Sequence, residues 1–330
     1  MDSLGAKPKI KFNNNVKLIF SDVDETVADV YRPADPALIP ELEKVLKEDR
    51  VIVFISGAGI ANINERIVNS INPKLRHNIL VAHCSGAEIW GYDKEGEVLP
   101  EPYYSLYDEK VNERQKQEFR DAIDQLLKEF KLKTFPTMPK DEFRKESSGD
   151  PLSIMLADRG PQITFEVTNA YDLNPEQEHE IEIEVPITHG SYDLRIPILE
   201  RAEKLFNELE LPITPRLAGT SSIDFAVAGV SKTTAVQWVL ENADKLKGIS
   251  LNKDELSKNP NLIEVWGDKY STINGGTDRH ICEGLPKEVR AIDFRQEDPD
   301  ELPKEYNIQF WDGQNHLHHG LLEYLQSRSN

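Results

Sequence analysis

The sequence predicts an α/β protein in which a parallel β-sheet, covered by helices on both faces, is interrupted by a separate α+β module. Two short runs, VKLIF at 16–20 and VIVFI at 51–55, are apolar apart from Lys17 and do not alternate with polar residues, which is typical of strands buried in a parallel sheet. The segment between them has helical spacing and completes a strand–helix–strand unit. Near Tyr103 the pattern changes, and the first pattern returns after residue 230.

The parallel-sheet part consists of two stretches of the chain. The first contains a predicted helix within 35–49, a helix at 62–71, and a strand followed by a Ser-Gly turn within 78–90. The second contains a helix at 231–246 with Ser231 as its N-cap, strands at 261–268 and 288–294, and a helix at 316–328.

The middle of the chain follows a different pattern. A long charged helix is predicted at 108–132, with Phe119, Ile123, Leu126, Leu127 and Phe130 on one face. The remaining predicted elements are a hairpin at 153–167, a half-exposed strand at 180–185, a helix at 193–211 and a strand at 221–229. Strands that are segregated from helices indicate an α+β module.

Composition limits the classes of function. The 330 residues carry a formal charge of −19, which argues against nucleic acid or an anionic membrane as a main partner. A small anionic substrate stays compatible with this charge, because a metal and a few local cations can reverse the field in one pocket. The two cysteines form no disulfide framework, no signal peptide is recognised, and no run approaches the about 18 apolar residues of a membrane span. We therefore expect a cytoplasmic protein.

Three predicted strands end in polar residues. VKLIF is followed by Asp22 and Asp24, VIVFI by Ser56 and Gly57, and LIEVW by Gly267 and Asp268. In an open α/β sheet, ligands bind beyond the carboxyl ends of the strands, so we expect these groups to meet at one edge. Lys232, in the first turn of a predicted helix, could reach the same place.

This set of residues suits phosphoryl transfer. Mg²⁺ prefers oxygen ligands, and it would neutralise the repulsion between Asp22 and the neighbouring carboxylates, with Asp268 completing the metal site. Asp22 would attack phosphorus, and Asp24 would protonate the leaving oxygen and later activate water. Thr26, Ser56 and Gly57 would bind phosphate oxygens, and Lys232 would offset negative charge.

The order Asp22-Val23-Asp24-Glu25-Thr26, Ser56, Lys232 and Gly267-Asp268 resembles the haloacid dehalogenase superfamily of phosphotransferases. Segments 219–236, 265–281 and 158–167 are similar to eukaryotic-type phosphomannomutases and their bacterial relatives. The resemblance implies a Rossmann-like core at 16–88 and 218–330, a cap domain at 89–217 and an N-terminal extension at 1–15. It also implies a magnesium cofactor and a homodimer formed through the cap.

The resemblance assigns further residues. Arg159 would bind the distal phosphate of the substrate, Ser222 and Asp224 would contact the sugar, and Asp278 would join Asp22, Asp24 and Asp268 at the metal. Each residue also has an ordinary alternative when it is taken singly. Ser56-Gly57 is compatible with a simple turn, Arg159 with a solvated hairpin tip, Ser222 and Asp224 with strand closure, and Asp278 with a helix N-cap.

The expected activity is magnesium-dependent hydrolysis of a phosphorylated sugar or similar small metabolite. A phosphohexomutase is the alternative, although the matched cap segment offers only Arg159 where a mutase needs several cations; Arg144, Arg195 and Arg201 would be candidates for the others. A non-catalytic binding protein is the third possibility, since Glu25 stands where the usual motif has glycine.

Overall fold

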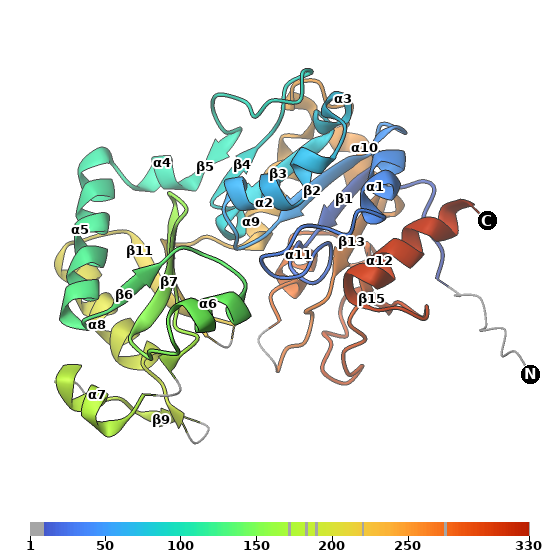
Figure 1. The fold of residues 1–330 in the computed structure, drawn as a ribbon. Coiled ribbons are helices and arrows are strands. Elements are labelled where there is room, and N and C mark those ends of the chain that lie inside the picture. The colour runs from blue at the N-terminus through green and yellow to red at the C-terminus, as the bar shows by residue number, and fades with distance from the viewer. Residues whose placement is uncertain are drawn as a thin grey trace, which may run out of the picture. The chain divides into compact units, whose positions relative to one another are not determined.

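The computed structural model describes residues 10–329 except 171–172, 182–183, 189–190, 220 and 274–275. It divides into two compact units (Figure 1). The core unit consists of Met1–Ser105 and Ser231–Asn330, and the inserted unit consists of Leu106–Val230. The predicted organisation, a core built from both ends of the chain around an insertion, therefore corresponds to the division that the structure makes.

An eight-stranded sheet forms the centre of the core unit, in the order β15-β14-β13-β1-β2-β3-β4-β5. The first six strands in this order run parallel, and β4 and β5 are antiparallel additions at one edge. The strands are β1 (Leu18–Ser21), β2 (Val51–Ile55), β3 (Ile79–His83), β4 (Glu88–Trp90), β5 (Tyr104–Ser105), β13 (Ile263–Gly267), β14 (Arg290–Asp293) and β15 (Asn307–Phe310).

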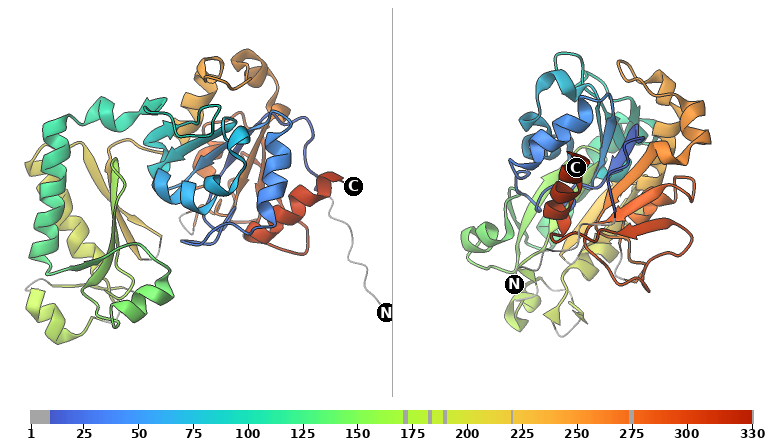
Figure 2. Two further views of the ribbon diagram at one scale, coloured as in Figure 1. Left: turned by 45° about the horizontal axis from the view of Figure 1, so that its top comes forward. Right: turned by 90° about the vertical axis from the view of Figure 1, so that its right-hand side faces the viewer.

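Helices cover both faces of this sheet (Figure 2). Along β1, Ile19 packs into the cluster formed with α1, α2 and α12, whereas Leu18 and Phe20 pack into the cluster formed with α9, α10 and α11. This alternation explains why Leu18, Ile19 and Phe20 of β1 are all apolar. The helices of this unit are α1 (Leu38–Leu46), α2 (Ile60–Arg66), α3 (Pro73–Arg76), α9 (Lys232–Glu241), α10 (Lys253–Lys258), α11 (Arg279–Cys282) and α12 (Leu317–Gln326).

The boundaries of the predicted domains need correction. Residues 89–105 belong to the core unit because β4 pairs with β3 and β5 pairs with β4. Residues 218–230 belong to the inserted unit because β12 pairs within the second sheet. The described part of the N-terminal extension, from Ile10, also packs on the core unit. The ring of Phe12 lies 5.6 Å from that of Tyr324, and Phe12 is buried.

The inserted unit contains a five-stranded sheet, in the order β11-β12-β8-β7-β6, and a two-stranded ribbon of β9 and β10. Its strands are β6 (Lys133–Phe135), β7 (Ser153–Asp158), β8 (Gln162–Glu166), β9 (Ile187–Thr188), β10 (Ser191–Tyr192), β11 (Ile213–Ala218) and β12 (Ser222–Val227). Its helices are α4 (Leu106–Lys110), α5 (Glu113–Glu129), α6 (Lys140–Glu146), α7 (Pro175–Ile181) and α8 (Arg195–Glu208).

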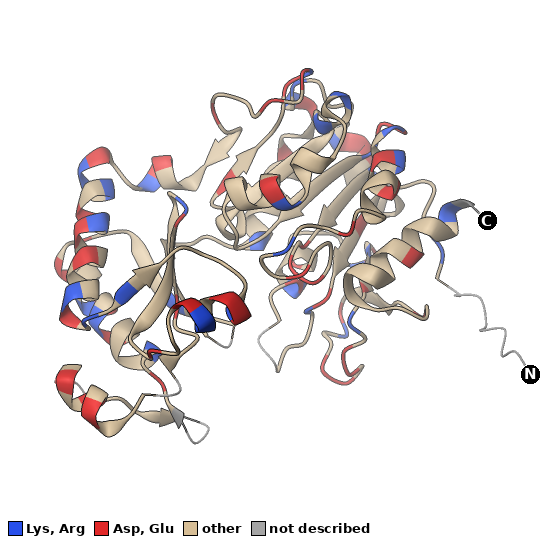
Figure 3. Cartoon of the chain, in the orientation of Figure 1, with Lys and Arg blue, Asp and Glu red and all other residues tan. Residues whose placement is uncertain are grey.

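Aromatic side chains join this sheet to its helices. Phe206 of α8 makes edge-to-face contacts with Phe119 of α5 and Phe225 of β12, and Phe225 contacts Phe165 of β8 in the same way. The outer side of α5 carries charges of both signs (Figure 3), as the sequence pattern predicted.

One predicted element is wrong. The alternation at 180–185 predicts a strand, but Glu180 and Ile181 end helix α7, and residues 184–185 lie in no regular element. Residues 182 and 183 of that prediction lie outside the described residues. Asn174 lies directly before α7, and its side chain accepts hydrogen bonds from the N–H groups of Glu176 and Gln177 in the first turn of this helix. A capped helix start therefore outweighs the weak strand pattern at 180–185.

The C-terminal helix is fixed to the core sheet through a buried carboxylate. Glu264 on β13 is fully buried, and its oxygens accept bonds from Tyr324 at 2.7 Å, Trp266 at 2.7 Å and Arg290 at 2.9 Å. Arg290 also donates to Tyr324 at 2.8 Å.

Among the described residues, no helix is both long and apolar enough to span a membrane.

Replacing Arg290 should therefore destabilise the core unit. Arg290→Met leaves the Glu264 carboxylate buried without its cation, which should lower the free energy of unfolding by about 3–5 kcal/mol. Tyr324→Phe removes the hydroxyl that donates to Glu264 and accepts from Arg290, but it keeps the ion pair, and it should cost about 1.5–3 kcal/mol. All four tryptophans lie in the core unit, so tryptophan fluorescence during urea denaturation monitors this unit. A smaller loss for Arg290→Met than for Tyr324→Phe would contradict the role assigned to the ion pair.

Candidate active site

The carboxyl ends of three neighbouring parallel strands, β13, β1 and β2, bring together the polar residues singled out in the sequence. Asp22 follows β1 directly, and its backbone N–H donates to the carbonyl of Trp266 on β13 at 2.9 Å. Asp268 follows β13, and Ser56 follows β2. Asp22, Ser56 and Asp268 are all buried, so the strand ends form a shielded site.

Lys232 links Asp22 to Asp278. Its ammonium lies 2.6 Å from Asp22 Oδ1 and 2.8 Å from Asp278 Oδ1, and the lysine is only 6% exposed. It is the first residue of α9, and the predicted N-cap is present, since the Ser231 side chain accepts from the N–H of Thr234 at 3.2 Å. Burial alone would lower the pKa of Lys232, but the two carboxylates raise it above its ordinary value, so the side chain is a permanent cation.

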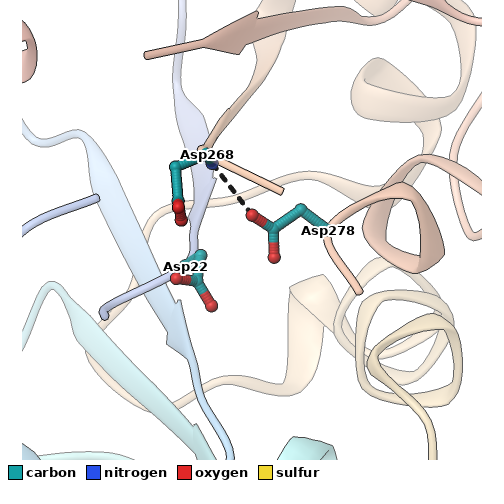
Figure 4. Close-up of side chains that lie close together, drawn as sticks. All are labelled: Asp22, Asp268 and Asp278. Atoms are coloured by element: carbon teal, nitrogen blue, oxygen red, sulfur yellow. Dashed lines mark hydrogen bonds between the residues drawn. The ribbon is translucent and has the colours of Figure 1, made fainter. Parts of the chain in front are cut away.

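Asp278 is held by the backbone that follows β13. Its Oδ2 accepts the N–H of Asp268 at 2.9 Å (Figure 4). The same oxygen also accepts the N–H of Lys269 at 2.9 Å. A Cβ at Gly267 would lie 2.8 Å from this Oδ2 and 2.6 Å from the Tyr270 hydroxyl, so only glycine allows the approach. The Gly-Asp pair at 267–268 therefore has a geometric basis.

Asp22, Asp268 and Asp278 form an acidic cluster. One oxygen from each carboxylate lies within 4.8 Å of the others. Burial and the charge of Asp278 raise the pKa of Asp22 well above its ordinary range, and the same two causes raise the pKa of Asp268 to about 7. These shifts mean that nearby cations do not fully compensate the three charges. A cluster of oxygen ligands whose negative charge is not fully compensated could hold a magnesium ion; the sequence-based expectation named these three residues together with Asp24.

Two further contacts orient Asp268. The Thr26 hydroxyl donates to Asp268 Oδ1 at 3.0 Å, and Arg295 donates to Asp268 Oδ2 at 2.7 Å. Thr26 is fully buried, so in this arrangement its hydroxyl serves the Asp268 carboxylate. The sequence-based assignment of Thr26 to phosphate binding stays a prediction.

The Asp24 carboxylate lies outside the acidic cluster. Its Oδ1 accepts from Arg66 at 2.8 Å, and its Oδ2 accepts from the Ser56 hydroxyl at 3.2 Å. The Ser56 oxygen also accepts the N–H of Ala58 at 3.0 Å. At Gly57, a Cβ would meet only Ser85 Oγ, at 3.9 Å, so packing does not require glycine there.

Glu25 adopts a left-handed backbone conformation, with φ of 67°. Its carboxylate pairs with Arg295 and, at 3.0 Å, with Lys269. Burial would raise the pKa of Glu25, but the bonds and charges of Lys269 and Arg295 lower it. The side chain thus fits the turn where the resembling family has glycine, and it forms an ion-pair cluster beside Asp268.

The three predicted cap residues all lie in the inserted unit, on neighbouring strands or their hairpin. Arg159 follows β7, where its N–H donates to the carbonyl of Gln162 at 2.9 Å and closes the predicted hairpin. Asp224 on β12 accepts from the Thr164 hydroxyl at 2.8 Å, and burial raises its pKa against the charges of Arg216 and Arg159. Ser222 precedes Asp224 on the same strand and is half-buried.

Sequence reasoning missed several of these contacts. Arg295 lies two residues beyond the end of β14, so the strand-end rule that identified Asp268 would also have identified it. Arg66 has no comparable signal, because a charged residue at the end of a short helix is common. Arg216 and Thr164 face Asp224 across the sheet, and only the strand register brings them together.

The acidic cluster predicts a pH dependence for metal-free protein. Because the pKa of Asp268 rises from 3.8 when unfolded to about 7 when folded, the folded state binds more protons, and stability falls as pH rises between these values. We expect the melting temperature in EDTA to drop by ~5 °C over this interval. Magnesium should reduce the slope, and so should Asp268→Asn. An equal slope in Asp268→Asn protein would show that the dependence has another source.

The backbone at Glu25 predicts a difference between two truncations. Glu25→Ala and Glu25→Gly lose the same ion pairs, but only glycine adopts positive φ without strain. We expect Glu25→Gly to be more stable than Glu25→Ala by about 1 kcal/mol in urea denaturation. If the alanine variant proves equally stable, the turn must be able to relax.

No protein-family model matches the sequence, and no curated protein matches it. Among solved structures, the chain is similar to a haloacid dehalogenase-like hydrolase from Bacteroides thetaiotaomicron, with 16% identity and a TM-score of 0.53 over 94% of this chain and 98% of that one. It is also similar to the C-terminal domain of C. albicans trehalose-6-phosphate phosphatase, with 13% identity and a TM-score of 0.53 over 94% and 91% of the two chains. This chain therefore has the fold of the haloacid dehalogenase superfamily, with a Rossmann-like core and an inserted α+β unit.

Proposed function

We propose that this chain is a magnesium-dependent phosphatase that hydrolyses a phosphorylated sugar or similar small metabolite through an aspartyl-phosphate intermediate. The observation that carries the proposal is the Lys232 ammonium between Asp22 and Asp278, with Asp268 beside them. A buried carboxylate that is next to a permanent cation and two further acidic groups suits nucleophilic attack on phosphorus better than a structural role.

In the proposed reaction, the Asp22 carboxylate attacks the phosphorus of the ester. The charge of Lys232 opposes the rise in the pKa of Asp22, which favours the ionised carboxylate, and it reduces repulsion between this carboxylate and the incoming phosphate. Asp24 donates a proton to the leaving oxygen, and it then removes a proton from the water that cleaves the acyl phosphate. The products are the alcohol and inorganic phosphate, and Asp22 is regenerated.

Asp22 and Asp268 would hold the magnesium ion. Asp278 would complete the acidic cluster at the ion, and because its oxygens accept N–H bonds from Lys232 and from the backbone, it would also hold Lys232 in place. The ion would supply charge neutralisation for the phosphate when bound. Thr26 and Arg295 support this role because they orient the Asp268 carboxylate.

The inserted unit supports a polyol-like substrate. Thr164, Asp224 and Arg216 lie opposite one another on three adjacent strands and present hydroxyl, carboxylate and guanidinium groups from the same side of the sheet. Such groups form hydrogen bonds with sugar hydroxyls. One of the structurally similar proteins is named a trehalose-6-phosphate phosphatase, and a sugar phosphate is consistent with that likeness.

Hydrolysis is favoured over mutase action by the charge balance of the inserted unit. A mutase must hold a second phosphate, which needs several uncommitted cations. Two of the candidates, Arg195 and Arg201, are paired with Asp193 and Glu129. Arg216 faces Asp224 at 3.6 Å, so this side of the sheet carries offsetting charges.

A single reaction followed by phosphorus NMR tests the proposal. With magnesium and a panel of hexose phosphates, we expect net release of inorganic phosphate, with little exchange between hexose 1- and 6-phosphates even when a hexose bisphosphate is added. Asp22→Asn should lower turnover by about 10³-fold or more, because the nearly isosteric amide is a poor nucleophile.

Two outcomes would contradict the proposal. Isomer exchange that runs ahead of phosphate release would make the protein a phosphohexomutase. No turnover of any ester, together with magnesium-induced stabilisation, would favour a binding protein on this fold. As a control for the metal site, Asp268→Ala should lose most of the thermal stabilisation that magnesium gives the native protein.

A further inference from the structure

Arg66 contacts the candidate acid/base directly. It is the last residue of α2 and is only 4% exposed. Its guanidinium donates to Asp24 Oδ1 at 2.8 Å, while the Ser56 hydroxyl occupies Asp24 Oδ2 at 3.2 Å. The carboxylate of Asp24 is therefore held at both oxygens, although about a third of the side chain is exposed, at 31%.

The same guanidinium also fixes the loop that follows Asp24. It donates to the backbone carbonyls of Asp29 at 2.6 Å and Arg32 at 2.9 Å, and the carbonyl of Arg66 accepts the N–H of Ala34 at 2.9 Å. A buried arginine whose donors all have fixed acceptors is a rigid support, because the planar fork cannot turn without breaking several bonds.

We infer that Arg66 is a positioning residue, which orients Asp24 so that Asp24 Oδ2 faces the leaving oxygen. This inference rests on the proposed phosphatase function. A guanidinium can only donate, so the oxygen that it contacts is committed as an acceptor. The Ser56 hydroxyl can donate or accept, so Oδ2 is the oxygen that can carry a proton without losing its neighbour.

A purely structural Arg66 would behave differently. If it only held the 28–34 loop in place, its removal would lower activity by the same factor for every substrate. If it acts through Asp24, its removal should matter most when the leaving group needs a proton. General acid catalysis typically contributes about 10²- to 10⁴-fold, so the two cases are separable.

The experiment compares kcat/KM for phenyl phosphate and p-nitrophenyl phosphate in the presence of magnesium. p-Nitrophenolate leaves without protonation, whereas phenolate benefits from an acid. For Arg66→Gln we expect a loss at least about tenfold larger with phenyl phosphate. In an Asp24→Asn background, Arg66→Gln should add less than about threefold. Asn62→Ala is the matched control, since Asn62 accepts from the same guanidinium at 3.1 Å but does not contact Asp24.

The outcomes separate the inference from the proposed function. Equal losses for the two esters, or an undiminished loss in the Asp24→Asn background, would overturn the positioning role and leave the phosphatase intact. Native protein that hydrolyses neither these esters nor any hexose phosphate of the panel would remove the proposed function, and the inference with it. If thermal melting shows that Arg66→Gln is unfolded, Arg66→Lys replaces it in the same comparison of the kcat/KM losses for phenyl phosphate and p-nitrophenyl phosphate. Lysine keeps the positive charge but lacks the planar guanidinium that orients Asp24.

Discussion

One buried positive charge, that of Lys232, holds the candidate site together. It joins Asp22 at the end of the first strand to Asp278 in the last third of the chain, and both carboxylates are almost completely buried. A lysine with a single partner at this depth would be costly, and so would three carboxylates without it. The N-cap at Ser231 and the absent side chain at Gly267 both serve this arrangement, since one fixes the start of α9 and the other admits Asp278.

The two aspartates of the first motif have opposite surroundings although only one residue separates them. Asp22 faces other carboxylates and a lysine, and burial dominates the rise of its pKa. Asp24 turns toward an arginine and a serine, outside the acidic cluster. A carboxylate among negative charges is suited to hold a cation and to attack phosphorus, whereas one that is oriented by hydrogen bonds is suited to exchange protons. The different surroundings of these two identical side chains are consistent with the different tasks proposed for them.

The sequence predicted the core sheet, and two of the three carboxylates of the acidic cluster, for one physical reason: strands that are buried on both faces are largely apolar, so the polar residues that follow them are conspicuous. That signal located Asp22 and Asp268. That signal did not identify Arg66, whose contacts depend on a loop that folds back onto α2. Nor did it identify Arg216, which lies opposite Asp224 only because of the strand register. The strand predicted at 180–185 failed because a period of two over six residues competes poorly with a nearby capped helix start.

The insertion has a consequence for how the chain is made. In the central sheet, β1 lies between β2 and β13, and Leu18 pairs with Ile263, so the partner on one side of β1 is synthesised only after the whole of Leu106–Val230. At about 5–20 residues per second, β1 waits roughly 10–50 seconds for β13 to emerge. An apolar strand with an open edge is a template for wrong pairing. The inserted unit is continuous in sequence and can fold during that interval. The core unit cannot complete its sheet, so the open edge of β1 must be kept from pairing with other strands until β13 has been synthesised.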